Sequence, residues 1–442
     1  MPLITAIADD DTGATDLAGM LTSQGLRTIV VLDDCEFDQL QEWSRSADAV
    51  IVGTASRSIP RQHAYDRTYR AAMTLLRLNP QLIALKYCST FDSTPEGNIG
   101  ASIDAAMDAT GELFTVALAA LPALGRTTYM GYHFVHDKLL SDSVLRHHPL
   151  HPMTNSHLPS HLQSQTRRRV GSVTYGDGRT ISSITERLIA LQTEGVEIAL
   201  LDCIDEAHLE RNVGAIAAMR LITGSSGWAT ALPKILRTRG LLGPPATNLV
   251  PHRAEMGRGF LIVSGSCSDA TRAQNRWMSA QEDCLAIHLD ALALLDGTSN
   301  CDPAVATIDR ALSAGRTCLL TTTEVCDVAK LHAKAAQIGL TPTRAGDRIS
   351  TSLACLVKKI VSVTPPQGLI VAGGETSSAL MRSLELGGLR VGPNIEPGVP
   401  VCVALAMPFL GLALKSGNFG SPEFFAHARS AILNLPQGDL LS

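Results

Sequence analysis

Three carboxylates stand side by side directly after the first apolar run of the chain, in the stretch IADDDTGAT over residues 7–15. Aspartates at the end of a strand can accept hydrogen bonds from the hydroxyls of a polyol, or take a proton from one. We therefore expect Asp9 and Asp10 to bind or activate a hydroxyl, beside a helix that begins at Ala14 and exposes its first N–H groups. The alternative is a helix N-cap followed by a solvated acidic turn.

The same stretch also resembles the start of a haloacid-dehalogenase-type phosphatase. There a nucleophilic Asp is followed two residues later by a second Asp, and two residues after that by Thr or Val. Asp9 and Asp11 fit this spacing, but position 13 is a glycine. A phosphatase is therefore the weaker enzymatic alternative.

Further polar clusters follow apolar runs that predict strands: TASRS (residues 54–58), KYCSTFDSTPEGNIG (86–100) and GRTTYMGYH (125–133). Arg57 offers a planar fork that suits a carboxylate. Lys86, Ser89 and Asp92 place a cation, a hydroxyl and a carboxylate beside a buried strand, and Arg126 adds another cation. Because the carboxyl ends of parallel strands meet at one edge of a sheet, we expect these groups to converge.

The second half of the chain has a different chemistry. Its strand ends carry small-residue turns: SGSCSDAT (residues 264–271), AGGETS (372–377) and KSGNFG (415–420). Gly373 and Gly374 permit close approach of the backbone, and Glu375 with Thr376 opens a helix. Each turn alone would be a helix cap, but the three together favour a nucleotide phosphate site. Neither GxxxxGK[ST] nor GxGxxG occurs, which excludes a Walker loop and a Rossmann fingerprint.

The elements that must position these groups alternate along the chain. Short β-branched runs and stretches of helical period predict an α/β protein of two α/β domains, with largely parallel sheets and an interdomain cleft. In the first part we expect strands at residues 3–8, 26–32, 48–54, 82–88, 113–120 and 196–202, and helices at 14–25, 61–79 and 182–192. In the second part we expect strands at 259–265, 317–323, 368–374 and 411–417, a helix at 375–386, and helices from about Asp269, Val325 and Ser421, the last capped by its serine and Pro422.

Domain boundaries follow from composition. Residues 236–258 carry Pro and Gly without apolar period and predict a linker between domains at 1–235 and 259–442. A chain of 442 residues is too long for one ordinary core, which also favours two domains.

The overall charge and composition argue against several classes of function and location. A net charge of −5 gives no basic field for nucleic acid or an anionic membrane. The N-terminus lacks the pattern of a signal peptide, and Pro400 and Pro408 interrupt the most apolar stretch, so we expect a cytoplasmic protein without a membrane span. The ten cysteines form no CxxC pair, and the histidines between residues 133 and 151 lack acidic or Cys partners at ligand spacing. We therefore expect no protein-bound metal site and take the histidines as polar loop packing.

Taken together, the motifs resemble the four-carbon acid sugar kinases, most closely those that phosphorylate 3-oxo-tetronate at its 4-hydroxyl. The residues that carry the resemblance are IADDxTGATD, TxSR, KYCSTFDSTPEGNIG, GRT, RHHPLxPMTxS (residues 146–156), SGSCS, GGETS and LALKSGNFGSPEFF. They span both halves of the chain in the order found in the family.

The resemblance implies an N-terminal domain that binds a sugar acid, a C-terminal domain that binds ATP with Mg²⁺, and transfer of a phosphoryl group to the terminal hydroxyl. It implies these residues for the sugar acid: Asp9, Arg57, Ser89 and Arg126 in binding, and Asp10, Lys86 and Asp92 in catalysis. It implies these for the nucleotide: Ser264, Ser266, Gly373, Gly374, Glu375, Thr376, Ser377 and Gly417. Within this set Asp10 is the first candidate for the proton acceptor and Asp92 the second. The implied partners are a small sugar acid and ATP, with a homodimer left open.

The sequence departs from the family pattern at two places near these residues. Asp11 stands where the family has a bulky apolar residue, so either the loop is more solvated or an extra acid reaches the site. Leu124 stands where an Asn precedes GRT, which changes the groups available to read hydroxyls. Threonate, erythronate and a branched oxo sugar acid therefore remain alternative substrates, and a non-catalytic sugar-acid-binding protein is the rival from another class.

Overall fold

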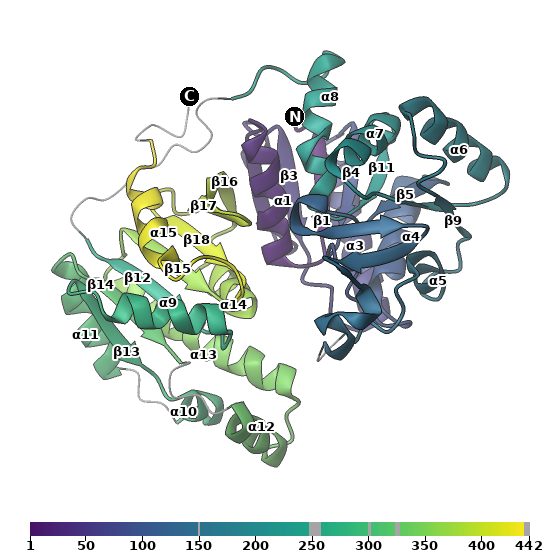
Figure 1. The fold of residues 1–442 in the computed structure, drawn as a ribbon. Coiled ribbons are helices and arrows are strands. Elements are labelled where there is room, and N and C mark those ends of the chain that lie inside the picture. Colours follow the sequence, from purple (N-terminus) through teal and green to yellow (C-terminus); the bar gives the residue numbers. More distant parts are fainter. Residues whose placement is uncertain (149–150, 247–257, 299–301, 323–327, 437–442) are drawn as a thin grey trace. The chain divides into compact units, whose positions relative to one another are not determined.

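Each half of the chain is built on a largely parallel β-sheet covered by helices, as the computed structural model shows (Figure 1). The structure describes residues 1–148, 151–246, 258–298, 302–322 and 328–436. The chain divides into two units, Met1–Thr247 and Asn248–Ser442. The α/β class that the alternating pattern predicted is confirmed.

In the first unit, strands and helices alternate through most of the chain. Its described elements are β1 (Ile4–Ala8), α1 (Asp11–Ser23), β2 (Thr28–Leu32), α2 (Phe37–Ser44), β3 (Ala49–Gly53), α3 (Arg61–Leu76), β4 (Leu82–Lys86), α4 (Asn98–Thr110), β5 (Thr115–Leu118), η1 (Pro122–Leu124), β6 (Arg126–Tyr129), β7 (Tyr132–Val135), β8 (Lys138–Leu139), η2 (Leu140–Asp142), η3 (Val144–His147), α5 (Leu158–Gln163), β9 (Val170–Val173), α6 (Ile181–Thr193), β10 (Ile198–Leu201), α7 (Glu206–Ile216), β11 (Leu221–Gly224), η4 (Ser226–Thr230) and α8 (Leu232–Thr238).

The strands of the first unit run parallel in the order β2-β3-β1-β4-β11-β5-β10-β9. Every residue of β1 to β4 is buried, as expected when helices cover a sheet on both faces. The short apolar runs of the sequence therefore form strands here, because they can bury both alternating faces. β3, β1 and β4 are direct neighbours, so their carboxyl ends lie together.

The second unit has its own strands and helices. Its described elements are β12 (Phe260–Ser264), α9 (Asp269–Ser279), β13 (Cys284–His288), α10 (Ala291–Asp296), α11 (Asp302–Ser313), β14 (Thr317–Thr321), α12 (Val328–Gln337), α13 (Pro342–Val363), β15 (Gly368–Ala372), α14 (Gly374–Ser383), β16 (Gly388–Glu396), β17 (Val399–Ala404), β18 (Gly411–Lys415) and α15 (Phe424–Leu433).

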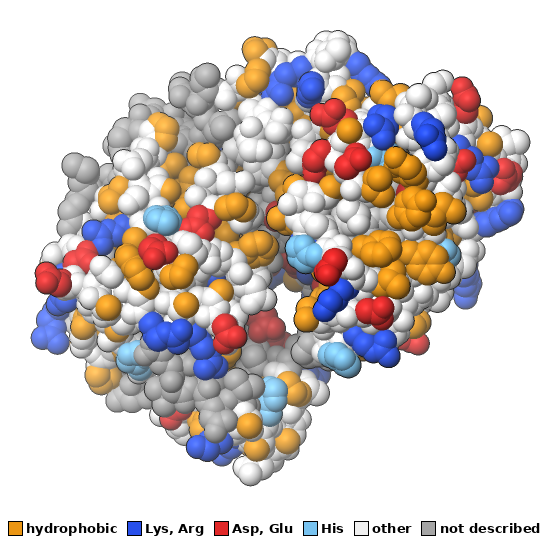
Figure 2. All heavy atoms as spheres, viewed as in Figure 1, with side chains coloured by type: hydrophobic (Ala, Val, Ile, Leu, Met, Phe, Trp, Pro, Cys, Tyr) orange, Lys and Arg blue, Asp and Glu red, His pale blue; other side chains and the backbone are white. Residues whose placement is uncertain are grey.

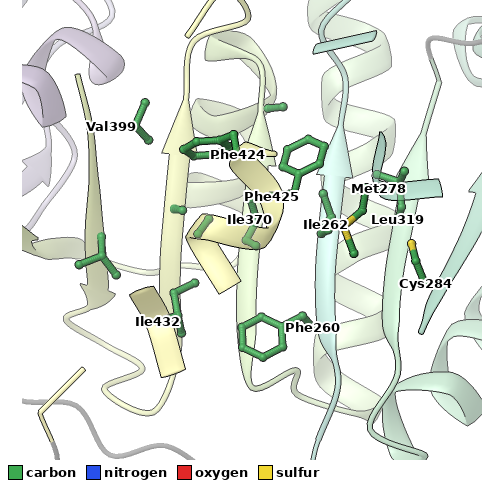
Figure 3. Packing of buried hydrophobic residues seen from close by; sticks show 14 of the residues in the cluster. Phe260, Ile262, Met278, Cys284, Leu319, Ile370, Val399, Phe424, Phe425 and Ile432 are labelled. Carbon is green, nitrogen blue, oxygen red and sulfur yellow. The ribbon is translucent and has the colours of Figure 1, made fainter. Parts of the chain in front are cut away.

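Parallel strands of this unit run in the order β13-β14-β12-β15-β18, and β17 and β16 continue the sheet antiparallel. A core covers one face, where Phe424 and Phe425 of α15 and Met278 of α9 lie over the strands of this sheet (Figure 3). The two Phe rings meet edge to face with centroids 6.1 Å apart. β12, β15 and β18 are neighbours, so the three small-residue turns leave adjacent strands.

Several predicted boundaries are wrong. Arg126 does not follow a sheet strand but opens β6 of a separate antiparallel sheet, β6-β7-β8, because β5 ends at Leu118 and a 3₁₀ turn intervenes. The last helix begins at Phe424, not at Ser421, because the backbone N–H and hydroxyl of Ser421 are both donated to Glu396 at 2.7 Å. The helix start expected near Val325 lies outside the described residues.

The predicted linker and the molecular surface complete the description. Residues 236–238 still belong to α8, and the N–H of Ala246 is donated to the carbonyl of Gly25 at 2.9 Å. Figure 2 shows acidic and basic side chains interspersed, without a continuous basic face in this view. Among the helices that the structure describes, none is long and apolar enough to cross a membrane.

Candidate functional site

Asp9 is fixed by the backbone at three neighbouring strand ends of the first unit. Its N–H is donated to the carbonyl of Lys86 at the end of β4. Its own carbonyl accepts the N–H groups of Ser56 and Arg57 at 2.8 and 3.1 Å. β1 therefore delivers its first carboxylate between the polar turns that follow β3 and β4.

Arg57 closes this arrangement with its guanidinium group. Nε and one terminal nitrogen donate to the two oxygens of Asp9 at 2.9 and 2.7 Å, and the same terminal nitrogen contacts Asp10. Burial alone would lower the pKa of Arg57, but the charges of Asp10 and Asp9 raise it well above its ordinary value. The fork that the sequence offered for a substrate carboxylate is thus held by two carboxylates of the protein.

Asp10 is the N-cap of α1, which begins at Asp11 rather than at Ala14. Its carboxylate accepts the N–H of Gly13 and the hydroxyl of Thr12. Burial would raise the pKa of Asp10, but the charges of Arg57 and Lys86 and these two hydrogen bonds lower it below its ordinary value. Asp10 therefore stays ionised and is well placed to accept a hydrogen bond.

Lys86 is 5% exposed, and its ammonium lies directly over the first turn of α1. A Cβ added at Gly13 would come within 2.3 Å of Nζ, so any other residue at this position would displace the ammonium. Nζ lies 3.9 Å from Asp16, which also accepts the hydroxyl of Ser226 at 2.7 Å. Burial raises the pKa of Asp16, against the charge of Lys86 and that hydrogen bond. The sequence had not indicated Asp16, which lies on α1, or Ser226, which follows β11.

Asp92 lies on the segment after β4 and faces the same residues. Its carboxylate accepts the hydroxyl of Thr90 at 2.5 Å. Asp92, Asp9 and Arg57 line one cavity of about 10 Å³, about the space that a single water needs. Ser89 contributes its carbonyl, which accepts a hydrogen bond from His133 at 2.8 Å.

Two histidines that the sequence analysis assigned to loop packing belong to this neighbourhood. His133 is fully buried; burial and the charge of Arg126 lower its pKa to about 4, against the hydrogen bond to Ser89 and the charge of Asp92. His151 is bonded to the hydroxyl of Ser58 at 2.9 Å, and its pKa is lowered by burial and by His148. Their spacing in the sequence carried no signal, because β7, which contains His133, and the segment that contains His151 are remote in sequence from these strand ends.

Arg126 lies on β6, next to the carbonyl of Leu124, which accepts a hydrogen bond from its guanidinium group. Its Nε is buried and has no hydrogen-bond partner in the part of the chain that the structure describes. Arg126 and Asp92 both act electrostatically on the ring of His133. Among the described residues, Arg126 thus retains a guanidinium nitrogen without a protein acceptor.

Asp11 is buried, with an exposed fraction of 3%. Its carboxylate lies against Gly53 at the end of β3, where an added Cβ would meet an Asp11 oxygen at 2.3 Å. The expectation of a more solvated loop is therefore wrong. A glycine in β3 makes the room that this carboxylate occupies in place of an apolar side chain.

Three small-residue turns of the second unit interlock at the ends of β12, β15 and β18. The carbonyl of Ala372 accepts the N–H groups of Gly265 and Ser266 at 3.0 and 3.2 Å. Gly373 has a φ of 127°, a conformation open to glycine, and an added Cβ would lie 3.3 Å from the Ser266 nitrogen. An added Cβ at Gly417 would lie 2.2 Å from the Ser266 hydroxyl. Glycines at positions 265, 373 and 417 thus allow the three turns to pack closely against one another.

The hydroxyl-bearing residues of these turns differ in access. Thr376 is buried, and its hydroxyl lies between the two turns, close to Gly265 and Gly373. Ser264 and Ser377 are fully buried, with exposed fractions of 0% and 1%. Ser266, by contrast, is only partly buried and lies in the turn itself. The predicted nucleotide residues with hydroxyl groups therefore form two sets. Ser264, Thr376 and Ser377 are buried beneath the turns, whereas Ser266 lies within a turn and is partly exposed.

Glu375 opens α14 beside these turns, and its carboxylate lies over Gly346 of α13. Partial burial and the charge of Asp347 raise its pKa, although the side chain as a whole is exposed. Among the described residues, no three His, Cys, Asp or Glu side chains are grouped to hold a metal ion. A divalent cation would thus find at most a pair of carboxylates here.

The two halves of the chain match two domains that family models describe. Residues 4–232 match a family model described as a sugar-binding N-terminal domain, and residues 261–425 match a nucleotide-binding C-terminal domain. Among curated proteins, the chain is 39% identical to a 3-oxo-tetronate kinase of Cupriavidus necator, over 97% of this chain and 96% of that protein. It is 37% identical to one of Pseudomonas fluorescens, over 97% and 96% of the two chains.

Solved structures show the same fold. A Salmonella typhimurium LT2 protein, provisionally described as a tRNA synthase, is 34% identical with a TM-score of 0.79, over 96% of this chain and 98% of that one. A Haemophilus influenzae protein is 31% identical with a TM-score of 0.75, over 97% and 100% of the two chains.

A sugar-binding and a nucleotide-binding domain in one chain define a small-molecule kinase rather than a phosphatase or a binding protein. The chain belongs to the four-carbon acid sugar kinase family. A kinase with such a domain uses ATP as its phosphoryl donor.

Proposed function

We propose that this kinase phosphorylates the terminal 4-hydroxyl of 3-oxo-tetronate. The observation that carries the proposal is the cluster of Asp9, Asp10, Arg57 and Lys86 at three neighbouring strand ends of the sugar-binding domain. It supplies anionic acceptors for hydroxyls and cations for charged oxygens. The names of relatives that are 36–39% identical over nearly the full length support the same substrate.

Arg126 is the residue proposed to bind the substrate carboxylate. Arg57 already donates to both oxygens of Asp9 and contacts Asp10, so it is better suited to hold these acids in place. Arg126 has a buried Nε without a described protein acceptor, and a buried donor without a partner costs about 1–3 kcal/mol. A carboxylate bound there would satisfy it.

Lys86 is proposed to offset the charge that develops on the transferred phosphoryl group. Its ammonium is buried and fixed over Gly13, so it needs no reorganisation when the reaction occurs. Asp9 and Asp10 would accept hydrogen bonds from substrate hydroxyls, and the Ser89 region would border the same site.

Asp92 is the better of the two candidate proton acceptors on physical grounds. Asp10 caps α1, contacts Arg57 and has a lowered pKa, so it attracts a proton weakly. Asp92 accepts one hydroxyl and lines the cavity with Asp9 and Arg57. Asp10 would then orient the hydroxyl while Asp92 takes its proton.

The turns of the second unit are proposed to hold the nucleotide. Backbone N–H groups at Gly374 and Gly417, beside the partly buried Ser266, would contact phosphate oxygens, because helix N-termini and glycine-rich turns favour anions. Ser264, Thr376 and Ser377 would support these turns from beneath. The nucleotide site would further include Gly373 and Glu375.

Mg²⁺ is proposed to accompany ATP. Mg²⁺ commonly binds through one or two carboxylates together with substrate phosphates, and Glu375 with Asp347 fits that donor set. The ion would supply positive charge to the phosphate oxygens. The backbone N–H groups of the turns would provide the protein's own share of that charge.

The test is ADP release from the full chain with ATP, Mg²⁺ and a panel of four-carbon acids. We expect 3-oxo-tetronate to give the highest kcat/KM, and phosphorus NMR to locate the phosphate on the 4-hydroxyl. Leu124, in place of the family's Asn, makes threonate, erythronate and a branched oxo acid the comparison substrates. Turnover of one of these in preference to 3-oxo-tetronate would reassign the substrate, and no ADP release with any acid would end the proposal.

A further inference from the structure

Lys415 has no role in the predicted nucleotide site, and its side chain contacts the small-residue turn that follows β18. Lys415 is the last residue of β18 and is 1% exposed. Its ammonium donates to the hydroxyl of Thr271 at 3.0 Å and to the carbonyls of Ser416 and Gly417 at 3.1 and 3.0 Å. An ammonium has three N–H groups, so all of them are used within the protein.

These bonds hold the turn after β18 on the start of α9. The Gly417 carbonyl accepts Lys415 Nζ, the Ser268 hydroxyl at 2.6 Å and the Thr271 hydroxyl at 2.8 Å. Ser268 is the N-cap of α9, and an added Cβ at Gly417 would contact Ser266. With its carbonyl turned inward to these three donors, the Gly417 turn is kept against the helix N-terminus.

The charge of Lys415 is compensated only weakly by the protein. Its three acceptors are neutral oxygens, and no ion pair to a carboxylate is found for it within the described ranges. Burial lowers the pKa of Lys415 to about 8, and the charge of Glu396 on β16 opposes this. Glu396 itself accepts hydrogen bonds from Ser421 and from His427 of α15. A buried cation without a paired anion is costly, and a bound phosphate nearby would reduce that cost.

We propose that Lys415 is a positioning residue of the nucleotide site, whose ammonium fixes the Gly417 turn and supplies buried positive charge to the phosphates. The inference rests on the proposed nucleotide site and adds a residue and a proton dependence to it. Nucleotide affinity therefore falls when Lys415 loses its proton.

The experiment is calorimetric titration of the full chain with MgADP between pH 7 and pH 9.5. We expect the Kd of the wild type to rise by up to about tenfold per pH unit once the pH exceeds the pKa of Lys415. Lys415→Met should bind MgADP about 10- to 100-fold more weakly at pH 7, with little change up to pH 9.5. Thr271→Val keeps the ammonium and loses one of its partners, so it should bind more weakly but retain the pH slope.

Two control variants separate the proposal from trivial explanations. Lys359→Met removes an exposed lysine of the same unit and should leave the Kd and its slope unchanged. His427→Gln removes the histidine that contacts Glu396 and should also leave the slope unchanged. Wild-type affinity in Lys415→Met, or loss of the slope in His427→Gln, would overturn the proposal.

The inference can be tested even if Lys415→Met does not fold. If Lys415→Met fails to fold, a flat Kd of the wild type from pH 7 to 9.5 overturns the proposal, and a rising Kd that Thr271→Val shares supports it. MgADP binding is measured without any sugar acid. A protein that turns over no four-carbon acid but shows the slope therefore loses the proposed substrate and keeps this inference.

Discussion

The two candidate sites differ in the chemical groups that they would offer to an anion. In the first unit, ionised side chains at the ends of β3, β1 and β4 pair with one another, and Arg57 links Asp9 to Asp10. In the second unit, glycines at the ends of β12, β15 and β18 bring backbone together, and Lys415 is held beneath. Side chains can read the positions of hydroxyls and a carboxylate in one particular sugar acid. Backbone N–H groups suit a phosphate, whose charge is spread over equivalent oxygens.

Replacing Lys86 should give the largest effect, because it removes a fixed charge from the ionic site. We expect Lys86→Met to lower kcat by about 100- to 1,000-fold with a smaller change in the KM for ATP. Lys234→Met, at an exposed lysine of the same unit, is the matched control and should act like the wild type. An unchanged kcat in Lys86→Met would show that the ionic site does not take part in transfer.

Asp92 and Asp10 can be separated by amide substitutions. We expect Asp92→Asn to lower kcat by about 100-fold, as loss of a general base does. Asp10→Asn should lower it less, because Asn still caps α1 and accepts a hydrogen bond. The measurement is kcat against pH for both variants. A larger loss in Asp10→Asn would restore Asp10 as the proton acceptor.

A methyl group at Gly373 tests the backbone site without changing charge. The φ of 127° disfavours any other residue, and the added Cβ would press on Thr376 and Ser266. Gly373→Ala should raise the KM for ATP by about tenfold, if the strain is about 1–2 kcal/mol, and change the KM for the acid little. Gly243→Ala, where an added Cβ meets open space, is the control. An equal rise in both KM values would count against separate sites.

Acid should weaken the contribution of Asp10 to folding, and this is the smallest effect. Its pKa is lowered in the folded protein, so the stabilisation is present above its unfolded pKa near 3.9 and is lost as the pH falls through the folded value. Asp10→Asn should reduce the free energy of unfolding by about 1 kcal/mol at pH 7. The difference should shrink below about pH 4. A difference that stays constant with pH would mean that the charge of Asp10 does not stabilise the fold.

Much of the fold and part of the candidate sites could be predicted, because the spacing of apolar residues and the positions of glycines determine local backbone structure. The strands at residues 82–88 and 368–374 were placed within two residues of β4 and β15. The helix at Ser421 was wrong, although its serine and proline are good local signals, because Glu396 on a remote strand takes both donors of Ser421. α13 was not expected at all.

The composition of the strand ends by itself determined that one half of the chain is ionic and the other is rich in small residues. Only the tertiary structure decided which of those groups are already hydrogen-bonded within the protein. Arg57 donates to Asp9, His133 donates to the carbonyl of Ser89, and Lys415 donates to the carbonyl of Gly417. The reason is physical. Residue type sets which bonds a side chain can make, but the partners come from strands and loops far away in the sequence, and their positions depend on how the whole sheet packs.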